Sequence, residues 1–149
     1  MKVTTLLCFD FGSKHIGVAV GQTVTGTASP LVTIDSHNNR PDWEKIASVI
    51  ADWRPDAIVV GIPLTMHGTP QVMTEDAERF ARQLEGRFHI PVYGMDERLS
   101  TFEARERTGD NAELDAVAAQ AILESWMYEN REDLAQNSAT FETDEHAGL

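Results

Sequence analysis

The chain of 149 residues has a single cysteine, Cys8, and no apolar run long enough to cross a bilayer. One cysteine excludes an internal disulfide, and Cys8 lies in an apolar segment, so we expect a buried, reduced thiol in a cytoplasmic protein. A spanning helix needs about 20 apolar residues, which excludes an integral helical membrane protein. The N-terminus lacks a basic segment followed by an apolar stretch and a cleavage site, so we expect no secretion.

Basic residues are also scarce. The chain has 12 Lys and Arg against 24 Asp and Glu, a formal net charge of −12. Proteins that bind nucleic acid broadly and without specificity rely on basic patches, so the charge argues against that class. An acidic protein can still act on phosphates where metal ions and a few basic side chains line the site.

Apolar patterning predicts an α/β protein with a mixed sheet of five strands and helices on both faces. The predicted strands, in chain order, cover residues 5–10, 16–21, 26–34, 57–62 and 91–95. Because the first three are joined by short turns, we expect them to form an antiparallel meander. We expect one helix to begin at Pro41 and another to be capped by Thr69.

Two further predictions concern the C-terminal third of the chain. Ser100 and Glu103 form a capping box, which predicts a short helix, and a final helix should follow. Its inward-facing residues are expected to be Leu114, Val117, Ala118, Ala121, Ile122 and Trp126. Beyond residue 128 polar and acidic residues dominate, which predicts a disordered acidic tail over residues 129–149.

Three acids lie where predicted elements meet. Asp10 ends the first apolar strand, where burial of a carboxylate is costly unless a cation compensates. Glu97 follows the strand at residues 91–95, and Asp115 lies near the start of the final helix. Since ligands bind at the carboxyl ends of parallel strands, we expect the three to share one rim.

Each acid also has a purely structural explanation. Asp10 can accept hydrogen bonds from the turn that follows it, Glu97 can pair with an arginine, and Asp115 can complement the dipole of its helix. Asp96 and Glu97 alternate along a strand, so only one of them should face the site. The residues alone leave that choice open.

Candidate substrate contacts lie beside the acids. Lys14 and Arg98 are candidates for phosphate binding, with solvated surface charges as the alternative. The loop from Gly61 to Gly68 could let a nucleic-acid backbone approach closely, because glycine has no side chain to obstruct it. An ordinary strand-to-helix turn is the alternative for this loop.

Four motifs occur in a fixed order. They are Asp10-Phe11-Gly12 with Ile16-Gly17-Val18-Ala19, Gly61-Ile62-Pro63-Leu64, Asp96-Glu97-Arg98-Leu99-Ser100-Thr101, and Leu114-Asp115. Together they resemble the YqgF family of RuvC-like proteins, named as Holliday junction resolvases and pre-16S rRNA nucleases. The resemblance implies a ribonuclease H-like nuclease domain over residues 1–128, cytoplasmic location and a role in maturing the 5′ end of 16S rRNA.

The resemblance also implies a site. Asp10, Glu97 and Asp115 would be catalytic and would bind two Mg²⁺ or Mn²⁺ ions, with Asp10 shared between them. The substrate would be nucleic acid, pre-rRNA more readily than a DNA junction, with ribosomal particles as partners, no membrane, and a monomer or weak homodimer as the active form. One departure is the stretch over residues 107–113, which is short and acidic where the family has a basic loop.

Three other functions remain open. A DNA endonuclease acting on Holliday junctions would need the same acids. A noncatalytic nucleic-acid or ribosome-associated binding protein agrees with the acidic charge, but three clustered carboxylates have no purpose there. An actin-like or sugar-kinase-like nucleotide binder would need two domains around the nucleotide, and 149 residues supply one.

Overall fold

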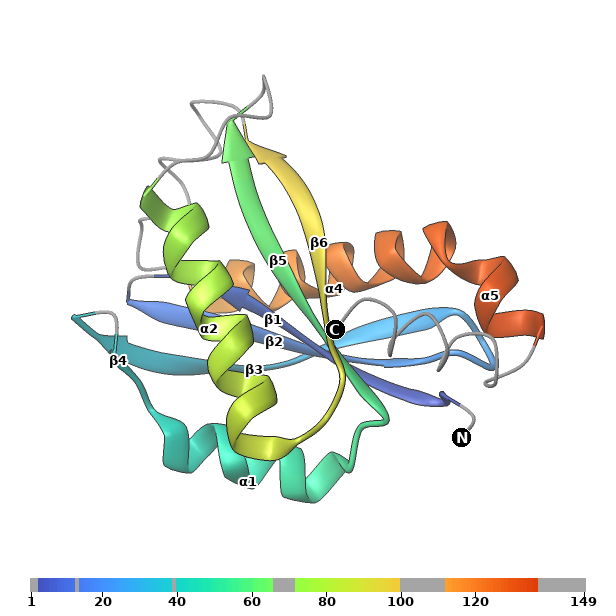
Figure 1. Ribbon diagram of the computed structural model, residues 1–149, viewed down its shortest axis with the longest axis horizontal. Coiled ribbons are helices and arrows are strands. Elements are labelled where there is room, and N and C mark those ends of the chain that lie inside the picture. The colour runs from blue at the N-terminus through green and yellow to red at the C-terminus, as the bar shows by residue number, and fades with distance from the viewer. Residues whose placement is uncertain (1–2, 13, 39, 66–71, 100–111, 137–149) are drawn as a thin grey trace.

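The computed structural model describes residues 3–12, 14–38, 40–65, 72–99 and 112–136 (Figure 1). Its strands are β1 Thr5–Phe11, β2 His15–Gln22, β3 Thr27–His37, β4 Arg40–Pro41, β5 Ala57–Thr65 and β6 Val92–Leu99. Its helices are α1 Trp43–Trp53, α2 Val72–Phe88, α4 Ala112–Glu129 and α5 Arg131–Gln136. No helix of this described part is long and apolar enough to cross a membrane.

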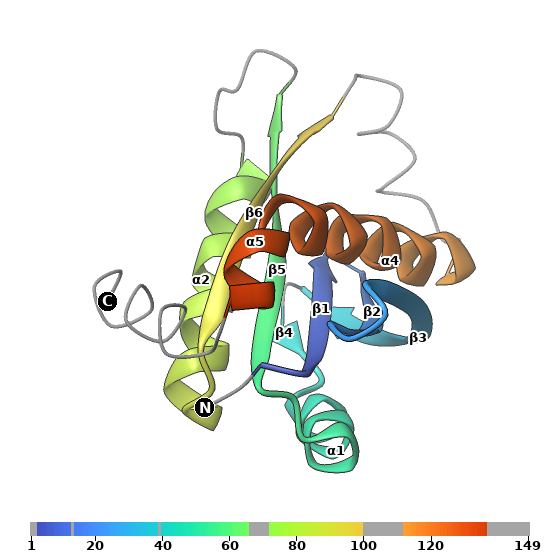
Figure 2. The same cartoon turned by 90° about the vertical axis from the view of Figure 1, so that its right-hand side faces the viewer.

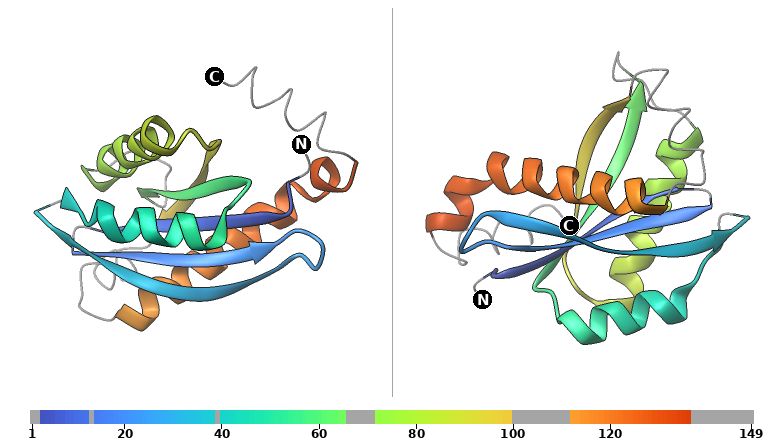
Figure 3. Two further views of the ribbon diagram at one scale, coloured as in Figure 1. Left: turned by 90° about the horizontal axis from the view of Figure 1, so that it is seen from below. Right: turned by 180° about the vertical axis from the view of Figure 1, so that it is seen from behind.

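The strands form one mixed sheet in the order β4-β3-β2-β1-β5-β6. β1, β2 and β3 are antiparallel neighbours, as the predicted meander requires, whereas β5 pairs parallel with both β1 and β6. The predicted α/β sheet is confirmed, and the two-residue strand β4 adds a sixth strand to the five expected. α1 and α2 cover one face of the sheet and α4 covers the other (Figures 2 and 3).

The face under α1 and α2 holds the larger core. Phe80 of α2 lies at its centre, with ring centroids 5.8 Å from Phe9 and 5.5 Å from Trp43. α1 begins two residues later than predicted, because Pro41 belongs to β4 and Asp42 is the N-cap, accepting a hydrogen bond from the Lys45 amide at 3.2 Å. Aromatic packing against α2 therefore fixes this side of the sheet.

The other face is closed by α4, which lies along β2. A Cβ at Gly17 would come within 1.9 Å of the Asp115 carbonyl oxygen, and one at Gly21 within 2.8 Å of Leu123 Cδ2. From Asp115 to Leu123 the helix rises about 12 Å, and from Gly17 to Gly21 the strand rises about 13 Å. The two close contacts are therefore about equally spaced along α4 and along β2. Small residues on this face of β2 let α4 approach the sheet closely.

The predicted inward face of this helix is partly wrong. Ile122 and Trp126 are buried as expected, but Val117 is 47% exposed and Ala121 is exposed too. The remaining buried positions are Ala116, Ala119, Leu123 and Met127. Alanines surround the helix, so the apolar pattern does not determine which side docks on the sheet.

The predicted tail is also wrong in its first part. Residues 131–136 form α5, and Leu134 packs against the core beneath α4. The Asn130 side chain donates a hydrogen bond to the Trp126 carbonyl at 2.8 Å, which closes the end of α4. Residues 137–149 lie outside the described residues, as do the expected cap at Thr69 and the capping box at Ser100, and these remain predictions.

Candidate active site

Asp10 is a buried carboxylate near the end of β1, with 5% of its surface exposed. Its side chain points to the α4 face, because strand residues alternate and Leu6 and Cys8 pack into the core there. Its register partners on both neighbouring strands are glycines, Gly17 on β2 and Gly61 on β5. Neither neighbour has a side chain, so Asp10 has room on a face that is otherwise filled.

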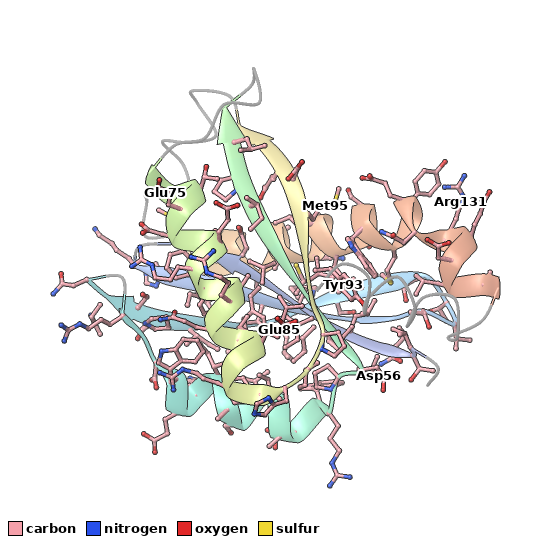
Figure 4. All side chains as sticks on the ribbon, in the orientation of Figure 1. Asp56, Glu75, Glu85, Tyr93, Met95 and Arg131 are labelled. Atoms are coloured by element: carbon pink, nitrogen blue, oxygen red, sulfur yellow. The ribbon has the colours of Figure 1, made fainter. Side chains whose placement is uncertain are left out.

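Glu97 lies on the same face, from β6. Tyr93 and Met95, labelled on β6 in Figure 4, pack into the core beneath α4, and Glu97 follows them in the alternation. A Cβ at Gly61 would lie 3.1 Å from Glu97 Oε2 and 3.6 Å from Asp10 Oδ1. The two carboxylates therefore flank Gly61. Asp96 is exposed, and its place in the alternation is on the opposite face.

The sequence predicts a turn that begins at Gly61, and this prediction is wrong. Gly61 lies within β5, buried, and its missing Cβ would be 2.7 Å from Ile122 Cδ1 of α4. Its position shows a different use for the glycine, since any side chain would fill the space between the two carboxylates. Gly68, the other glycine of the predicted loop, lies outside the described residues.

Asp115 comes to this region from α4. Its carbonyl oxygen lies over Gly17, the register partner of Asp10 on β2, so the backbone of this third acid lies beside Asp10, on the side away from Gly61 and Glu97. Asp115 Oδ2 and Glu97 Oε2 are both buried from water. Burial of carboxylate oxygens costs free energy unless a cation or hydrogen-bond donors compensate it, which suits a cation-binding site.

The donor set fits a hard divalent cation. Mg²⁺ prefers oxygen ligands and is usually held by one or two carboxylates, the remaining ligands being water and substrate phosphate. Among the described residues, no three His, Cys, Asp or Glu side chains are grouped closely enough to hold one ion. The geometry therefore fits ions held by carboxylate pairs, of which Asp10 with Glu97 is one.

The predicted phosphate contacts are only partly described. Lys14 is exposed in the turn between β1 and β2, and its carbonyl accepts a hydrogen bond from the Ser36 amide at 2.8 Å. The backbone of Arg98 belongs to β6, while its side chain lies outside the described part of the structure. Both residues remain predicted contacts.

Two residues that matter for the site were missed from the sequence. Gly17 leaves room for the backbone of α4. The sequence contains a signal for this close approach, because Gly17, Ala19 and Gly21 are small residues at every second position of one strand. His15 begins the same strand, and its Nδ1 lies 3.4 Å from Asp35 Oδ1. No spacing rule points to that pair.

Comparison with known proteins identifies the family of the chain. The family described as "RuvX: Holliday junction resolvase" matches residues 4–129. A protein of Pseudomonas putida named "Putative pre-16S rRNA nuclease" is 51% identical over 134 residues, which cover 84% of this chain and 95% of that protein. A protein of the same name from Azotobacter vinelandii is 50% identical over 132 residues, 83% of this chain and 93% of its own length.

A solved structure shares the fold at low sequence identity. T. thermophilus RuvC in complex with a Holliday junction substrate is 16% identical, has a TM-score of 0.50, and covers 86% of this chain and 96% of its own. This likeness supports the predicted ribonuclease H-like sheet and nothing finer. The match to residues 4–129 and the relatives at about half identity confirm the predicted resemblance, and the chain belongs to the RuvX family of Holliday junction resolvase-like nucleases.

Proposed function

We propose that this protein is a metal-dependent nuclease that hydrolyses phosphodiester bonds at the 5′ end of pre-16S rRNA in the cytoplasm. The observation that carries the proposal is the placement of Asp10 and Glu97 on either side of Gly61, with Asp115 brought over Gly17. The names of the relatives support the choice of RNA substrate. Ribosome biogenesis is then the process that this enzyme serves.

Asp10, Glu97 and Asp115 are the proposed catalytic residues and metal ligands. Two Mg²⁺ or Mn²⁺ ions would be held by these residues, with Asp10 as a ligand to both and Glu97 and Asp115 as a ligand to one each. Divalent ions supply stabilisation of the charge that develops on phosphate oxygens during hydrolysis. The carboxylates would fix where those ions bind, and α4 packs closely on β2 beside them.

Substrate binding falls to residues around this centre. Lys14, exposed beside the end of β1, is proposed to contact a backbone phosphate, as is Arg98 from the adjoining part of β6. Gly68 would allow a nucleic-acid strand to approach closely. Gly61 acts through the space that it leaves between Asp10 and Glu97. Ribosomal particles are the proposed partners, with a monomer or weak homodimer as the active form.

The direct test is cleavage of a labelled RNA spanning the 5′ precursor junction of 16S rRNA, with Mn²⁺ or Mg²⁺ added. Wild-type protein should cut the RNA only with metal, and Asp10→Asn should lose the activity. Glu97→Gln should lose it as well, whereas the matched control Asp96→Asn should keep it, because Asp96 is exposed and faces away from the site. Equal loss in Glu97→Gln and in Asp96→Asn would contradict the assignment of Glu97.

Metal binding has its own readout in the folded protein. Mn²⁺ that binds the native state raises its melting temperature, since ligands that bind only the folded chain stabilise it. Asp10→Asn should remove most of that increase while the protein without metal stays folded. If the increase survived in Asp10→Asn, the shared site would be wrong even where cleavage is lost.

A DNA endonuclease is the second candidate, favoured by the description of the family as a Holliday junction resolvase. A four-way DNA junction tested beside the RNA under the same conditions separates the two. Preferential cutting of the junction would replace RNA with DNA as the substrate. No cutting of either nucleic acid by folded, metal-loaded protein would favour the noncatalytic binding protein.

A further inference from the structure

His15 and Asp35 lie side by side on β2 and β3, near Asp10, and the roles given above do not use them. His15 is the first residue of β2, and Asp35 is its register partner on β3. His15 Nδ1 lies 3.4 Å from Asp35 Oδ1, with 23% of the histidine side chain and 70% of the aspartate side chain exposed. Alternation along β2 puts His15 on the α4 face with Gly17 and Ala19.

This position is next to Asp10. The register partner of Asp10 on β2 is Gly17, so His15, two residues earlier on the same face, is its diagonal neighbour. Diagonal neighbours in an antiparallel pair are about 7–8 Å apart, within reach of long and aromatic side chains. Gly17 adds no side chain of its own, and the imidazole of His15 therefore lies at the rim of the carboxylate centre.

The backbone of His15 is held in place by its neighbours. A Cβ at Gly12 would come within 2.5 Å of the His15 carbonyl oxygen, so the turn from β1 packs directly against it. On the other side, the Ser36 amide donates a hydrogen bond to the carbonyl of Lys14, the residue before it. The ring is thus presented from a fixed backbone, with Nδ1 directed toward Asp35.

Stability is a weak reason for such a pair. Ion pairs with an exposed partner contribute little to folding, and Asp35 is largely in water. Electrostatics gives a better reason, because the chain carries a net charge of −12 and groups carboxylates where a phosphate must approach. A cationic side chain on the same face offsets part of that repulsion.

We propose that His15, oriented by Asp35, binds a non-bridging phosphate oxygen of the nucleic-acid strand held at Asp10, Glu97 and Asp115. The inference rests on the proposed nuclease function and adds a residue to it. An imidazolium donates two hydrogen bonds at once, so Nδ1–H can serve Asp35 while Nε2–H serves the phosphate. The proposed bond from Nε2–H to a phosphate oxygen is of the charge-assisted kind, which is short and strong.

Binding of a fluorescently labelled single-stranded RNA, the same 16S precursor junction, tests this with the full chain in Ca²⁺. Anisotropy is measured over a series of salt concentrations, and a gel checks that the RNA stays intact. His15→Gln should bind about tenfold more weakly. Its plot of log K against log salt should have a slope smaller by about 0.7, the value for one phosphate contact on a single strand.

Three other variants sharpen the result. His15→Arg keeps a cation that can bind phosphate, so it should keep both the affinity and the salt slope. Asp35→Asn changes an exposed residue and should lose part of the affinity, which covers the case in which His15→Gln folds poorly. His89→Asn is the matched control, because His89 is exposed after α2 and asparagine tolerates its positive φ of 56°.

The outcomes separate this inference from the proposed function. Wild-type RNA binding with an unchanged affinity and slope in folded His15→Gln would overturn the phosphate contact alone. Slower cleavage by that variant with unchanged binding would also overturn it, since a phosphate contact must appear in the affinity. Failure of the wild-type protein to bind RNA at all would overturn both.

Discussion

Replacing Gly17 with alanine should displace helix α4 from the sheet. The added Cβ would lie 1.9 Å from the Asp115 carbonyl oxygen, 2.2 Å from its carbonyl carbon and 2.9 Å from the Ala116 nitrogen. All three are backbone atoms, so no side-chain rotation relieves the clash. Either the start of α4 or the edge of β2 must move.

The size of the displacement follows from those contacts. Ordinary carbon contacts begin near 3.4 Å, so the carbonyl of Asp115 must retreat by about 1.5 Å. Overpacking of this kind costs about 1–3 kcal/mol, which for a chain of this length lowers Tm by roughly 2–12 °C. Misplacing a catalytic group by about 1 Å can lower activity about 100-fold. Gly17→Ala should therefore lose more activity than stability.

Two other glycines supply matched controls for the melting and cleavage assays. The nearest atom to a Cβ at Gly21 is Leu123 Cδ2 at 2.8 Å, the tip of a side chain that can rotate, so Gly21→Ala should lose less stability than Gly17→Ala. A Cβ at Gly86 would meet nothing within 4 Å, and its place in α2 means that alanine should stabilise the helix by up to about 1 kcal/mol.

The order of the three variants decides whether α4 is seated on β2 as described. Thermal melts followed by circular dichroism give stability, and cleavage of the labelled precursor RNA gives activity. A Gly17→Ala protein with the melting temperature and activity of wild type would refute the close approach of Asp115 to Gly17. So would a Gly21→Ala protein that is damaged more severely than Gly17→Ala.

Two further predictions concern the anchoring of β5. Burial raises the pKa of Asp56, labelled in Figure 4, but hydrogen bonds from the Thr5 amide and from the amide and hydroxyl of Thr4 outweigh it and leave the pKa below 3.8. Asp56→Asn should lower the free energy of unfolding by about 1–3 kcal/mol at pH 7. Urea melts should show this difference between wild type and variant shrinking as pH falls below 3.8, through the lower pKa of the folded state. A difference that does not change with pH would contradict this. Thr74→Val removes a buried hydrogen bond to the carbonyl of Pro63, the register partner of Glu97. The variant should lose about 1–2 kcal/mol of unfolding free energy and should cleave more slowly. A variant as stable as wild type would contradict this.

The sequence predicts the side of the core under α1 and α2 well, because its apolar periodicity there has one interpretation. Ala77, Phe80 and Leu84 fall on a single stripe of the α2 segment, and all three are buried. Ile46 and Ile50 of α1 behave in the same way, whereas Trp53, expected on the same stripe, is 40% exposed at the end of the helix. Large apolar residues separated by charged ones leave no choice of face, so pattern and packing agree.

The same reasoning fails for α4, where small residues carry no such preference. Val117 was expected inside and is 47% exposed, while Ala116 and Ala119 are buried. What selects the docked side is the row of small residues on β2, which accepts the backbone of α4 at Gly17. Gly17 is 98 residues away from Asp115 in the sequence, so the periodicity of the helix alone does not show which of its sides packs on the sheet.

The ends of β5 and β6 were also predicted too short. Pro63 normally indicates the end of a strand, but the pairing of β5 with β1 stops at Gly61, and among the described residues only β6 pairs with it beyond that point. A proline is tolerated where a strand has an unpaired side. This longer ladder, from Gly61 with Met95 to Thr65 with Leu99, carries Glu97 within a strand and not in a loop.

The position of α4 late in the chain has a consequence during synthesis. One face of the sheet, with Leu6, Cys8 and Val59, is covered mainly by this helix, which begins at residue 112. Ribosomes add about 5–20 residues per second, so this apolar face waits for seconds after β5 has emerged. Asp115 arrives on the same helix, so the event that hides the exposed face from chaperones and proteases also brings the third proposed metal ligand next to β2. A newly made chain therefore covers its apolar face and gains Asp115 in the same folding step.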